Sequence, residues 1–327
     1  MEQFSRLLAN SQRIVLLQPE RIDPDSVGSA LALTQLLEDQ GKAITNFVLT
    51  PFPTSLKYFP RSEQFTTQLP RDFDMTILVD CGGPTQLTET FKKHQTVFAG
   101  KPFVIIDHHA NREPMPFATV DLVDATAASS GQQVAELADH FAWQLDAESA
   151  YSVAASIKSD TLDLSVSSVT SRTLKVMAKL VELGADLEKL RIDQEQAGSL
   201  TIELLPLKLK IFGRTQFYHA NKVAITYMTH PEYSKLGPDS ELDQQVKQEL
   251  RQLRGVLIAA LVIEKQPGNF KVSMRANIPA AGLIASLRGG GGHDKAASFF
   301  TTAKSIKQAM SEAADIITAG VKDYEAL

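Results

Sequence analysis

The chain has 327 residues, 43% hydrophobic and 22% charged, which is the composition of a folded protein of about two domains. Its formal net charge of −5 argues against non-specific coating of duplex nucleic acid, but it allows a small anion in a local basic pocket. The single cysteine, Cys81, excludes a disulfide framework, and no run approaches the roughly 18 apolar residues of a membrane span, so we expect a cytoplasmic protein without a membrane partner.

The first half of the chain alternates short apolar runs with segments of helical periodicity. Strands are predicted at 13–17, 44–49, 75–79 and 103–106, and helices at 28–40, 126–141, 147–158 and 171–184. Strands that alternate with helices predict an α/β fold with a mostly parallel sheet flanked by helices. Strands that are apolar throughout predict burial on both faces of that sheet.

The pattern changes after about residue 190. Strands are predicted at 202–212, 222–228, 256–264 and 271–275, and helices at 240–253 and 302–326. We therefore predict a first domain over 1–190, a linker over 191–203 and a smaller C-terminal α+β domain over 204–327, with a cleft between the two domains.

Acidic residues and histidines follow the predicted strands of the first domain. Asp23 and Asp25 lie after the first strand, Asp80 closes the strand 75–79, Asp107, His108 and His109 follow the strand 103–106, and Asp160 follows a predicted helix. The carboxyl ends of parallel strands share one edge, where ligands bind in open α/β sheets. Taken singly, such residues are more often caps or turns: Asp25 would cap the next helix and 107–109 would be a polar loop.

Several carboxylates and a neutral imidazole in one cleft need a cation to offset their repulsion. Oxygen and imidazole ligands suit Mn²⁺, Fe²⁺ or Zn²⁺, whereas an all-oxygen set favours Mg²⁺. A carboxylate that bridges two divalent cations is the usual arrangement for phosphoester hydrolysis. The sequence thus predicts a metal-dependent phosphoesterase.

The C-terminal domain contains a run of four glycines, Gly289, Gly290, Gly291 and Gly292. Such a run is often a flexible linker, but here it precedes His293 and a predicted helix start at 295–297. Bare backbone amides allow close approach of a phosphate, and a helix N-terminus favours anions. Arg275, on a predicted strand of the same domain, would add a bidentate phosphate contact. We predict that these residues bind substrate.

Together these motifs resemble the DHH phosphoesterase superfamily, in the subgroup with a C-terminal DHHA1 domain. The resemblance covers nearly the whole chain and is closest to the oligoribonuclease (nanoRNase) and 3′-phosphoadenosine 5′-phosphate phosphatase type. It rests on the motifs Asp23-Pro-Asp25-Ser-Val-Gly28-Ser29, Leu-Val-Asp80-Cys-Gly, Ile-Ile-Asp107-His108-His109, Ser129-Ser130-Gly131, Ser156-Ile-Lys-Ser-Asp160-Thr161, Ser273-Met-Arg275 and Gly289-Gly-Gly-Gly292-His293.

The resemblance implies two bound Mn²⁺ ions, with Mg²⁺ or another divalent metal as the alternative. The first ion would take Asp25, Asp80, His108 and Asp160. The second would take Asp23, Asp80 and a histidine placed before them. Asp80 and His109 are the implied catalytic residues, His109 being close to the scissile phosphate.

The chain departs from the family pattern at the first motif. The position of the family histidine is Pro19, next to Gln18, and the glycine between the two acids is Pro24. The second ion would therefore bind weakly, bind through Gln18 or Glu20, or be absent.

The implied activity is hydrolysis of short oligonucleotides or of 3′-phosphorylated nucleotides such as 3′-phosphoadenosine 5′-phosphate. The alternative is a nucleotide-binding or sensing protein that has lost one metal ligand. The partners are then small nucleotides, and the apolar helices of the first domain also allow a homodimer.

Overall fold

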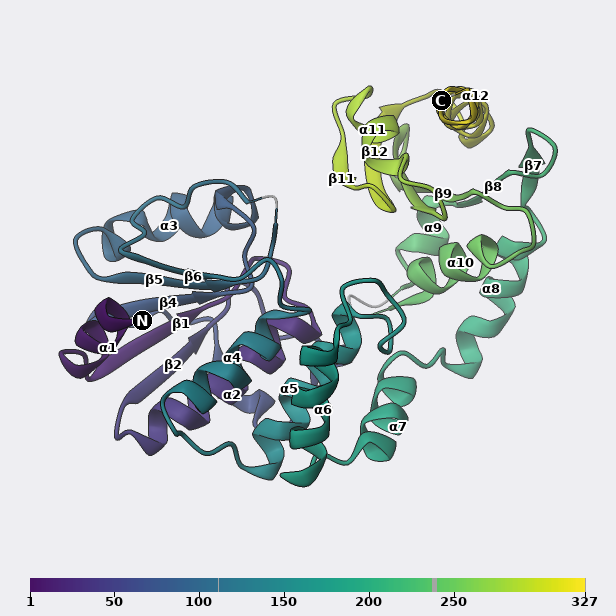
Figure 1. Cartoon of the computed structure of the whole chain (residues 1–327). Helices are drawn as coiled ribbons and strands as arrows, with labels where there is room; N and C mark the ends of the chain where they lie inside the picture. The colour runs from purple at the N-terminus through teal and green to yellow at the C-terminus, as the bar shows by residue number, and fades with distance from the viewer. Residues whose placement is uncertain (111, 237–239, 327) are drawn as a thin grey trace. The chain divides into compact units, whose positions relative to one another are not determined.

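The computed structural model describes residues 1–110, 112–236 and 240–326; the side chain of His293 lies outside the described part. The chain divides into two compact units, Met1–Ala197 and Gly198–Leu327 (Figure 1). The segment 191–203, predicted as a linker, contains this division and also the end of helix α7 (Leu187–Ala197).

The first unit is built on a six-stranded sheet with the order β3-β2-β1-β4-β5-β6, in which all neighbouring strands are parallel. Helix α3 covers one face, and α2, α4 and α5 cover the other (Figure 1). The elements are α1 (Glu2–Ala9), β1 (Arg13–Leu17), α2 (Pro24–Asp39), β2 (Ala43–Phe47), β3 (Phe65–Thr66), β4 (Met75–Val79), α3 (Thr88–Phe98), β5 (Phe103–Asp107), β6 (Val120–Val123), α4 (Ser130–His140), α5 (Ala147–Asp160), α6 (Ser171–Glu182) and α7, with 3₁₀ turns at Thr54–Leu56, Ser62–Gln64 and Pro84–Leu87.

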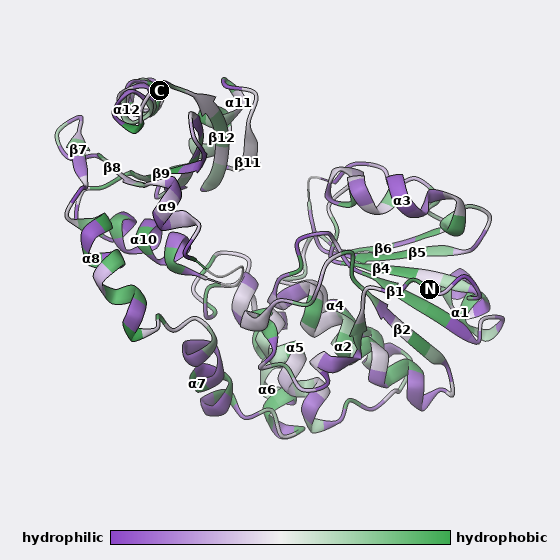
Figure 2. Ribbon diagram, turned by 180° about the vertical axis from the view of Figure 1, so that it is seen from behind, coloured by the Kyte–Doolittle hydropathy of each residue, from purple (hydrophilic) through white to green (hydrophobic). Residues whose placement is uncertain are grey.

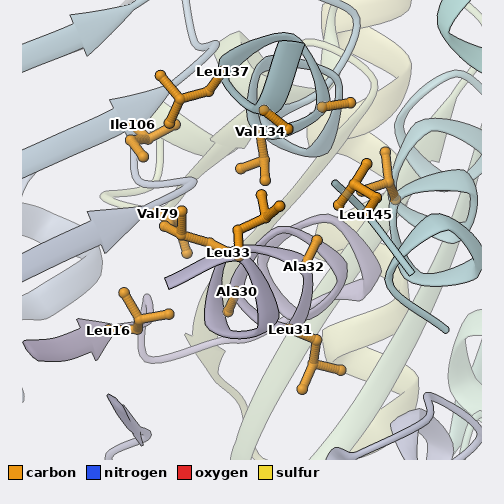
Figure 3. Packing of buried hydrophobic residues seen from close by; sticks show 14 of the residues in the cluster. Leu16, Ala30, Leu31, Ala32, Leu33, Val79, Ile106, Val134, Leu137 and Leu145 are labelled. Atoms are coloured by element: carbon orange, nitrogen blue, oxygen red, sulfur yellow. The ribbon is translucent and has the colours of Figure 1, made fainter. Parts of the chain in front are cut away.

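The central strands β1, β4 and β5 are mostly apolar because both of their faces are covered (Figure 2). Leu16, Val79 and Ile106 from three strands pack against α2 and α4 (Figure 3). Helix α2 is buried from Asp25 to Leu37, since it lies between the sheet and the helices α4 and α5. The carboxyl ends of β1, β4 and β5 are thereby fixed side by side.

The second unit contains another six-stranded sheet, with the order β11-β12-β10-β9-β8-β7. Only β8 and β9 pair in parallel; the other neighbours are antiparallel. Helix α12 packs on one face, and α8 and α10 pack on the other. The elements are a 3₁₀ turn at Ile202–Leu204, α8 (Leu205–Phe212), β7 (Gln216–Tyr218), β8 (Val223–Met228), α9 (His230–Tyr233), α10 (Leu242–Arg251), β9 (Ile258–Gln266), β10 (Asn269–Ala276), α11 (Ala281–Ser286), β11 (Gly291–His293), β12 (Ala296–Thr302) and α12 (Ile306–Glu325).

The predicted fold class is confirmed: a parallel α/β unit is followed by a smaller α+β unit. Across the described ranges, none of the helices has the length and apolar character needed to cross a bilayer.

Two local predictions in the second unit are wrong. The segment 202–212 is a 3₁₀ turn followed by helix α8, although its alternating apolar and polar residues favour a strand. Pro206 lies in the first turn of α8, where its missing N–H leaves no helical hydrogen bond unmade. The segment 295–297 enters strand β12 and does not begin a helix, because Ala296 and Ala297 pair with β10 and β11.

Glu232 joins α9 to the end of α8 through buried polar contacts. Its two carboxylate oxygens each lie 2.7 Å from a guanidinium nitrogen of Arg214, and one accepts a hydrogen bond from the backbone N–H of Thr229 at 3.0 Å. The hydrogen bonds from Arg214 outweigh burial and lower the pKa of Glu232. The ionised carboxylate therefore stabilises this unit at neutral pH.

We predict that Glu232→Gln lowers the free energy of unfolding at pH 7 by about 2 kcal/mol, the usual worth of a charge-assisted hydrogen bond. Because the folded-state pKa is depressed, the stabilisation is present above the unfolded pKa of about 4.3 and is lost as pH falls below it. Denaturant unfolding from pH 7 to pH 3 checks this. A difference between wild type and variant that does not shrink at low pH would contradict it.

Candidate metal centre

The His108 ring lies among three carboxylates at the carboxyl edge of the first sheet. Its Nε2 atom is 3.2 Å from Asp160 Oδ2, 3.4 Å from Asp25 Oδ2 and 3.6 Å from Asp80 Oδ1. These residues come from the end of α5, the first turn of α2 and the loops after β4 and β5. Two groups have ligand atoms close enough to share a cation: Asp25, His108 and Asp160, and Asp80, His108 and His109. The structure thus brings together all residues predicted for the first metal.

Asp25 is buried and is held by donors from two other helices. Its carboxylate accepts hydrogen bonds from the backbone N–H groups of Ser130 at 2.8 Å and Gly131 at 3.0 Å, and from the Ser156 hydroxyl at 2.6 Å. Ser29 donates a fourth bond at 3.1 Å. The N-terminus of α4 therefore binds the Asp25 carboxylate, as expected for an anion at a helix start. Asp25 does not cap its own helix, so that alternative is wrong.

Two glycines allow the helices to close around Asp25. A Cβ atom at Gly28 would overlap the backbone oxygen of Ser152, and one at Gly131 would overlap the Ser156 hydroxyl. These positions bring α2, α4 and α5 close enough for the donors to reach the carboxylate. The anchoring by Ser130, Gly131 and Ser156 was missed as a role from sequence, although the motifs that contain them stand out there.

His108 is shared by the two groups, and Asp80 belongs to the group with His109. Asp80 Oδ1 accepts a hydrogen bond from Ser130 Oγ at 3.1 Å and lies 3.9 Å from His109 Nδ1. Its backbone has φ = 56°, in the left-handed region that Asp and Asn tolerate better than most residues. Burial, and then the charges of Asp25, Asp23, Asp160 and Asp107, raise the pKa of Asp80 well above its ordinary value.

The same crowding of charged groups shifts the pKa values of the other members of the cluster. Burial favours the neutral form of His108, but the surrounding carboxylates of Asp160 and Asp25 outweigh it and raise the pKa of His108 to about 9. Burial and the charge of Asp25 raise the pKa of Asp160 to about 6. The raised pKa of His108 favours its protonated form when no metal is bound, and a divalent cation would replace that proton and add charge.

Asp107 orients His109. The Nδ1 atom of His109 lies 2.7 Å from Asp107 Oδ1, and Asp107 is buried. Although burial opposes it, the hydrogen bond with His109 lowers the pKa of Asp107, which favours the carboxylate as acceptor. A proton on Nδ1 leaves the Nε2 atom of His109 for another partner. This role of Asp107 was missed from the sequence, where the residue was noted only as part of the tripeptide.

Asp23 is the N-cap of α2. Its carboxylate accepts a hydrogen bond from the Ser26 N–H at 3.0 Å, and Pro24 occupies the first helical turn, where proline is favoured. Asp23 is exposed to solvent, yet desolvation by the surrounding chain and the charge of Asp25 raise its pKa. Pro24 thus fits the local fold, and Asp23 belongs to neither of the two ligand groups in the described structure.

The two residues that could replace the family histidine differ in their surroundings. Glu20 Oε1 accepts a hydrogen bond from the Thr90 N–H at 2.8 Å in the first turn of α3. Gln18, directly after β1, is buried, and neither its amide oxygen nor its amide nitrogen has a hydrogen-bond partner among the described residues. Gln18 is therefore the better candidate for an additional oxygen ligand.

The predicted substrate-binding residues lie in the second unit. Arg275, on β10, donates a hydrogen bond to Gln244 Oε1 at 2.8 Å, and the glycine run leads from the end of α11 into β11. His293 is described only by its backbone, at the end of β11.

The donor set fits a divalent cation. His108 Nε2 is a buried ring nitrogen without a hydrogen-bond partner among the described residues, and three carboxylate oxygens surround it. Three carboxylates and one or two imidazoles are the mixed oxygen and nitrogen donors that suit Mn²⁺, Fe²⁺ or Zn²⁺.

We predict that Asp80→Asn raises the melting temperature of the metal-free protein and abolishes its rise on addition of Mn²⁺. Asparagine accepts the left-handed backbone and relieves the crowding of buried acids, which we expect to add about 1 kcal/mol, or about 2–4 °C. Wild-type protein should gain about 2.7 kcal/mol when free Mn²⁺ exceeds its Kd a hundredfold.

Asp74→Asn is the matched control for these melting curves. Asp74 accepts hydrogen bonds from the backbone N–H groups of Arg13 and Gln12, which lower its pKa to about 2. Its loss should lower the melting temperature and leave the Mn²⁺ response intact. A full Mn²⁺ response in Asp80→Asn would contradict the assignment.

Comparison with known proteins supports the family resemblance seen in the sequence. Residues 13–169 match the model described as DHH family, N-terminal domain. The chain is 23% identical over 292 residues to the bifunctional oligoribonuclease and PAP phosphatase NrnA of Bacillus subtilis, covering 88% of this chain and 89% of that protein. It is 28% identical over 287 residues to the NrnA of Thermus thermophilus, covering 84% and 80%.

The solved structure of an exopolyphosphatase-related protein from Bacteroides fragilis has the same fold. It matches with a TM-score of 0.85 and 19% identity, over 99% of this chain and 96% of that chain. Residues 13–169 are therefore similar to the N-terminal domain of the DHH family, and the chain is similar to the NrnA proteins over most of its length.

Proposed function

We propose that this chain is a metal-dependent phosphoesterase that hydrolyses short oligonucleotides and 3′-phosphorylated nucleotides such as 3′-phosphoadenosine 5′-phosphate. The observation that carries the proposal is the cluster of Asp25, Asp80 and Asp160 around His108 Nε2. The related proteins of B. subtilis and T. thermophilus, which are named for these two activities, support the choice of substrate.

In the proposed reaction, Asp25, Asp80, His108 and Asp160 hold Mn²⁺ or another divalent cation. Bound cations would activate a water molecule and offset the charge that develops on the phosphoryl oxygens. Asp80 is placed beside both histidine rings, since its Oδ1 lies 3.6 Å from His108 Nε2 and 3.9 Å from His109 Nδ1.

His109 is the proposed acid or phosphate-binding group. Asp107 fixes the ring through Nδ1, so Nε2 is presented in one orientation. A protonated Nε2 would donate a hydrogen bond to a phosphoryl oxygen or to the leaving oxygen. Arg275 and the backbone of Gly289–Gly292 would bind the remaining phosphates of the substrate.

The second candidate function is nucleotide binding without appreciable hydrolysis. It is favoured by the first motif, where Gln18 and Pro19 stand in place of a histidine and the structure keeps Asp23 out of both ligand groups. Such a protein would bind nucleotides but turn them over slowly because one metal is missing.

Hydrolysis of a 5′-phosphorylated RNA dinucleotide separates the two candidates. Metal-stripped protein should release mononucleotides only after addition of Mn²⁺, and Asp80→Asn should reduce the rate by at least about a hundredfold, the usual scale for loss of a group at the reacting centre. Asp74→Asn should retain wild-type activity. Binding of the dinucleotide without turnover would favour the second candidate, and hydrolysis that survives in Asp80→Asn would contradict the first.

Gln18→His tests whether the missing imidazole limits metal binding. An imidazole at this buried position should lower the Kd of the weaker Mn²⁺ site about tenfold or more, as titration calorimetry would show, because it adds a stronger ligand than an amide oxygen. Gln64→His is the control, since Gln64 also has a buried amide oxygen without a partner among the described residues but belongs to a 3₁₀ turn elsewhere in the unit. Equal Mn²⁺ affinity in wild type and Gln18→His would show that Gln18 is not at the site.

A further inference from the structure

Arg112 lies beside the Asp107 carboxylate, in the loop that follows β5. Its Nη1 atom donates a hydrogen bond at 2.8 Å to Oδ2 of Asp121, a residue of β6. Its Nε atom lies 3.7 Å from Asp107 Oδ2, which is close enough for an ion pair but too long for a hydrogen bond. The side chain of Asp107 is fully buried and that of Arg112 is 16% exposed. One largely buried guanidinium thus faces two carboxylates.

The polar atoms between Arg112 and Asp107 have no other partner in the part of the chain that the structure describes. Arg112 Nε and Nη2 and Asp107 Oδ2 are buried, and none of them forms a hydrogen bond with a described residue. Buried donors and acceptors are normally paired, because an unpaired one destabilises the fold. The guanidinium and the carboxylate therefore compensate each other as an ion pair.

The loop that carries Arg112 is fixed against the loop after β4. The backbone N–H of Glu113 donates a hydrogen bond to the Gly82 carbonyl at 2.9 Å. A Cβ atom at Gly83 would come within 3.1 Å of Glu113 Cβ, so the absence of a side chain allows the two loops to approach closely. Met115 then packs into the apolar cluster that contains the β5 residues Phe103 and Ile105. These contacts hold Arg112 where its guanidinium meets Asp107.

A second contact on Asp107 affects the residue that Asp107 orients. Asp107 Oδ1 lies 2.7 Å from His109 Nδ1. The terminal torsion of an aspartate side chain is soft, so a carboxylate held through one oxygen alone can turn about that torsion. A cation at Oδ2 fixes the plane of the carboxylate, and it thereby fixes the direction from which Oδ1 accepts the hydrogen bond of the imidazole.

We propose that Arg112 is a positioning residue for His109. Asp121 holds the guanidinium, and the guanidinium fixes the Asp107 carboxylate. Asp107 then holds the Nδ1–H group of His109, so that Nε2 points in one direction. Arg112 acts through Asp107 and is not itself placed at the reacting atoms. The orientation of the ring stands on these contacts alone, whereas its consequence for catalysis rests on the proposed function.

Nuclear magnetic resonance of the full-length, metal-free protein with ¹⁵N-labelled histidine tests the orientation without hydrolysis. The Nδ1–H signal of His109 is assigned by its loss in His109→Gln, and its rate of exchange with water is measured. The hydrogen bond to buried Asp107 should protect this proton in the wild type. Arg112→Met keeps a long side chain without the charge, and it should speed the exchange about tenfold, the scale expected when a hydrogen bond to a charged group is weakened.

Arg61→Met is the matched control. Arg61 is another partly buried arginine of the first unit that pairs with two carboxylates, those of Asp146 and Glu148. Its loss should leave the exchange of the His109 proton unchanged. Asp121→Asn, at a half-exposed position, is the milder change if Arg112→Met does not fold, and it should speed the exchange by a smaller factor. Unchanged exchange in these two variants, or equal acceleration in Arg61→Met, would overturn the proposal.

Steady-state hydrolysis of the dinucleotide with Mn²⁺ tests the consequence for catalysis. A misdirected His109 ring loses contacts that strengthen in the transition state, so Arg112→Met should lower kcat about tenfold and change KM by less than about twofold. Arg112→Lys keeps a cation near Asp107 and should recover part of the lost kcat. Arg61→Met should keep the wild-type kcat. Equal kcat values in Arg112→Met and Arg61→Met would contradict the positioning role.

The two measurements separate this inference from the proposed function. If the wild type releases no product with Mn²⁺ but Arg112→Met speeds exchange of the His109 proton, the positioning of the ring stands and the hydrolytic function is wrong. If hydrolysis requires Asp80 while proton exchange and kcat are unchanged in Arg112→Met, the phosphoesterase assignment stands and the positioning role is wrong.

Discussion

Negative charge confined to one edge of a parallel sheet is the constraint on which the first unit depends. Asp25, Asp80 and Asp160 lie within 4 Å of one imidazole nitrogen, and two of them are almost fully buried. The fold stabilises this crowding with the N-terminus of α4, with three serine hydroxyls on Asp25 and Asp80, and with a protonated His108. A divalent cation would replace that proton and offset more charge, so the same contacts that hold the metal-free protein together prepare it for metal.

The position of most of this cluster could be predicted from the sequence because strand ends are easy to locate. The apolar strands β4 and β5 end at Asp80 and at Asp107, and parallel pairing necessarily brings those ends to one edge. Asp160 was harder to place, since its location depends on how α5 packs on α2. The donors to Asp25 come from residues more than 100 positions away, and no local pattern gives such a contact.

The two wrong predictions in the second unit also arise from tertiary contacts that the local sequence does not specify. The segment 202–212 alternates apolar and polar residues as a strand does, but Pro206 and packing against the sheet give a helix instead. Residues 295–297 are small and follow glycines, which suits either a helix start or a close-packed strand. Pairing with β10 and β11 decides for the strand, and strand pairing is a tertiary contact that local composition does not specify. The first motif shows the opposite case, in which the local sequence is sufficient. Pro24, between Asp23 and Asp25, departs from the family pattern, yet it fits the first turn of α2.

The two units divide the proposed chemistry by charge. The first concentrates carboxylates around His108, and in the second Lys247 Nζ lies 2.8 Å from Ser273 Oγ, with Lys271 and Arg275 on the same strand as Ser273. Anomalous diffraction at the manganese edge, from crystals grown with Mn²⁺, tests the central claim about the first unit most directly. A peak among Asp25, Asp80, His108 and Asp160 is expected, with a second, weaker peak toward Asp23. Manganese bound only at other carboxylates, with this cluster empty, would contradict the assignment of a metal centre.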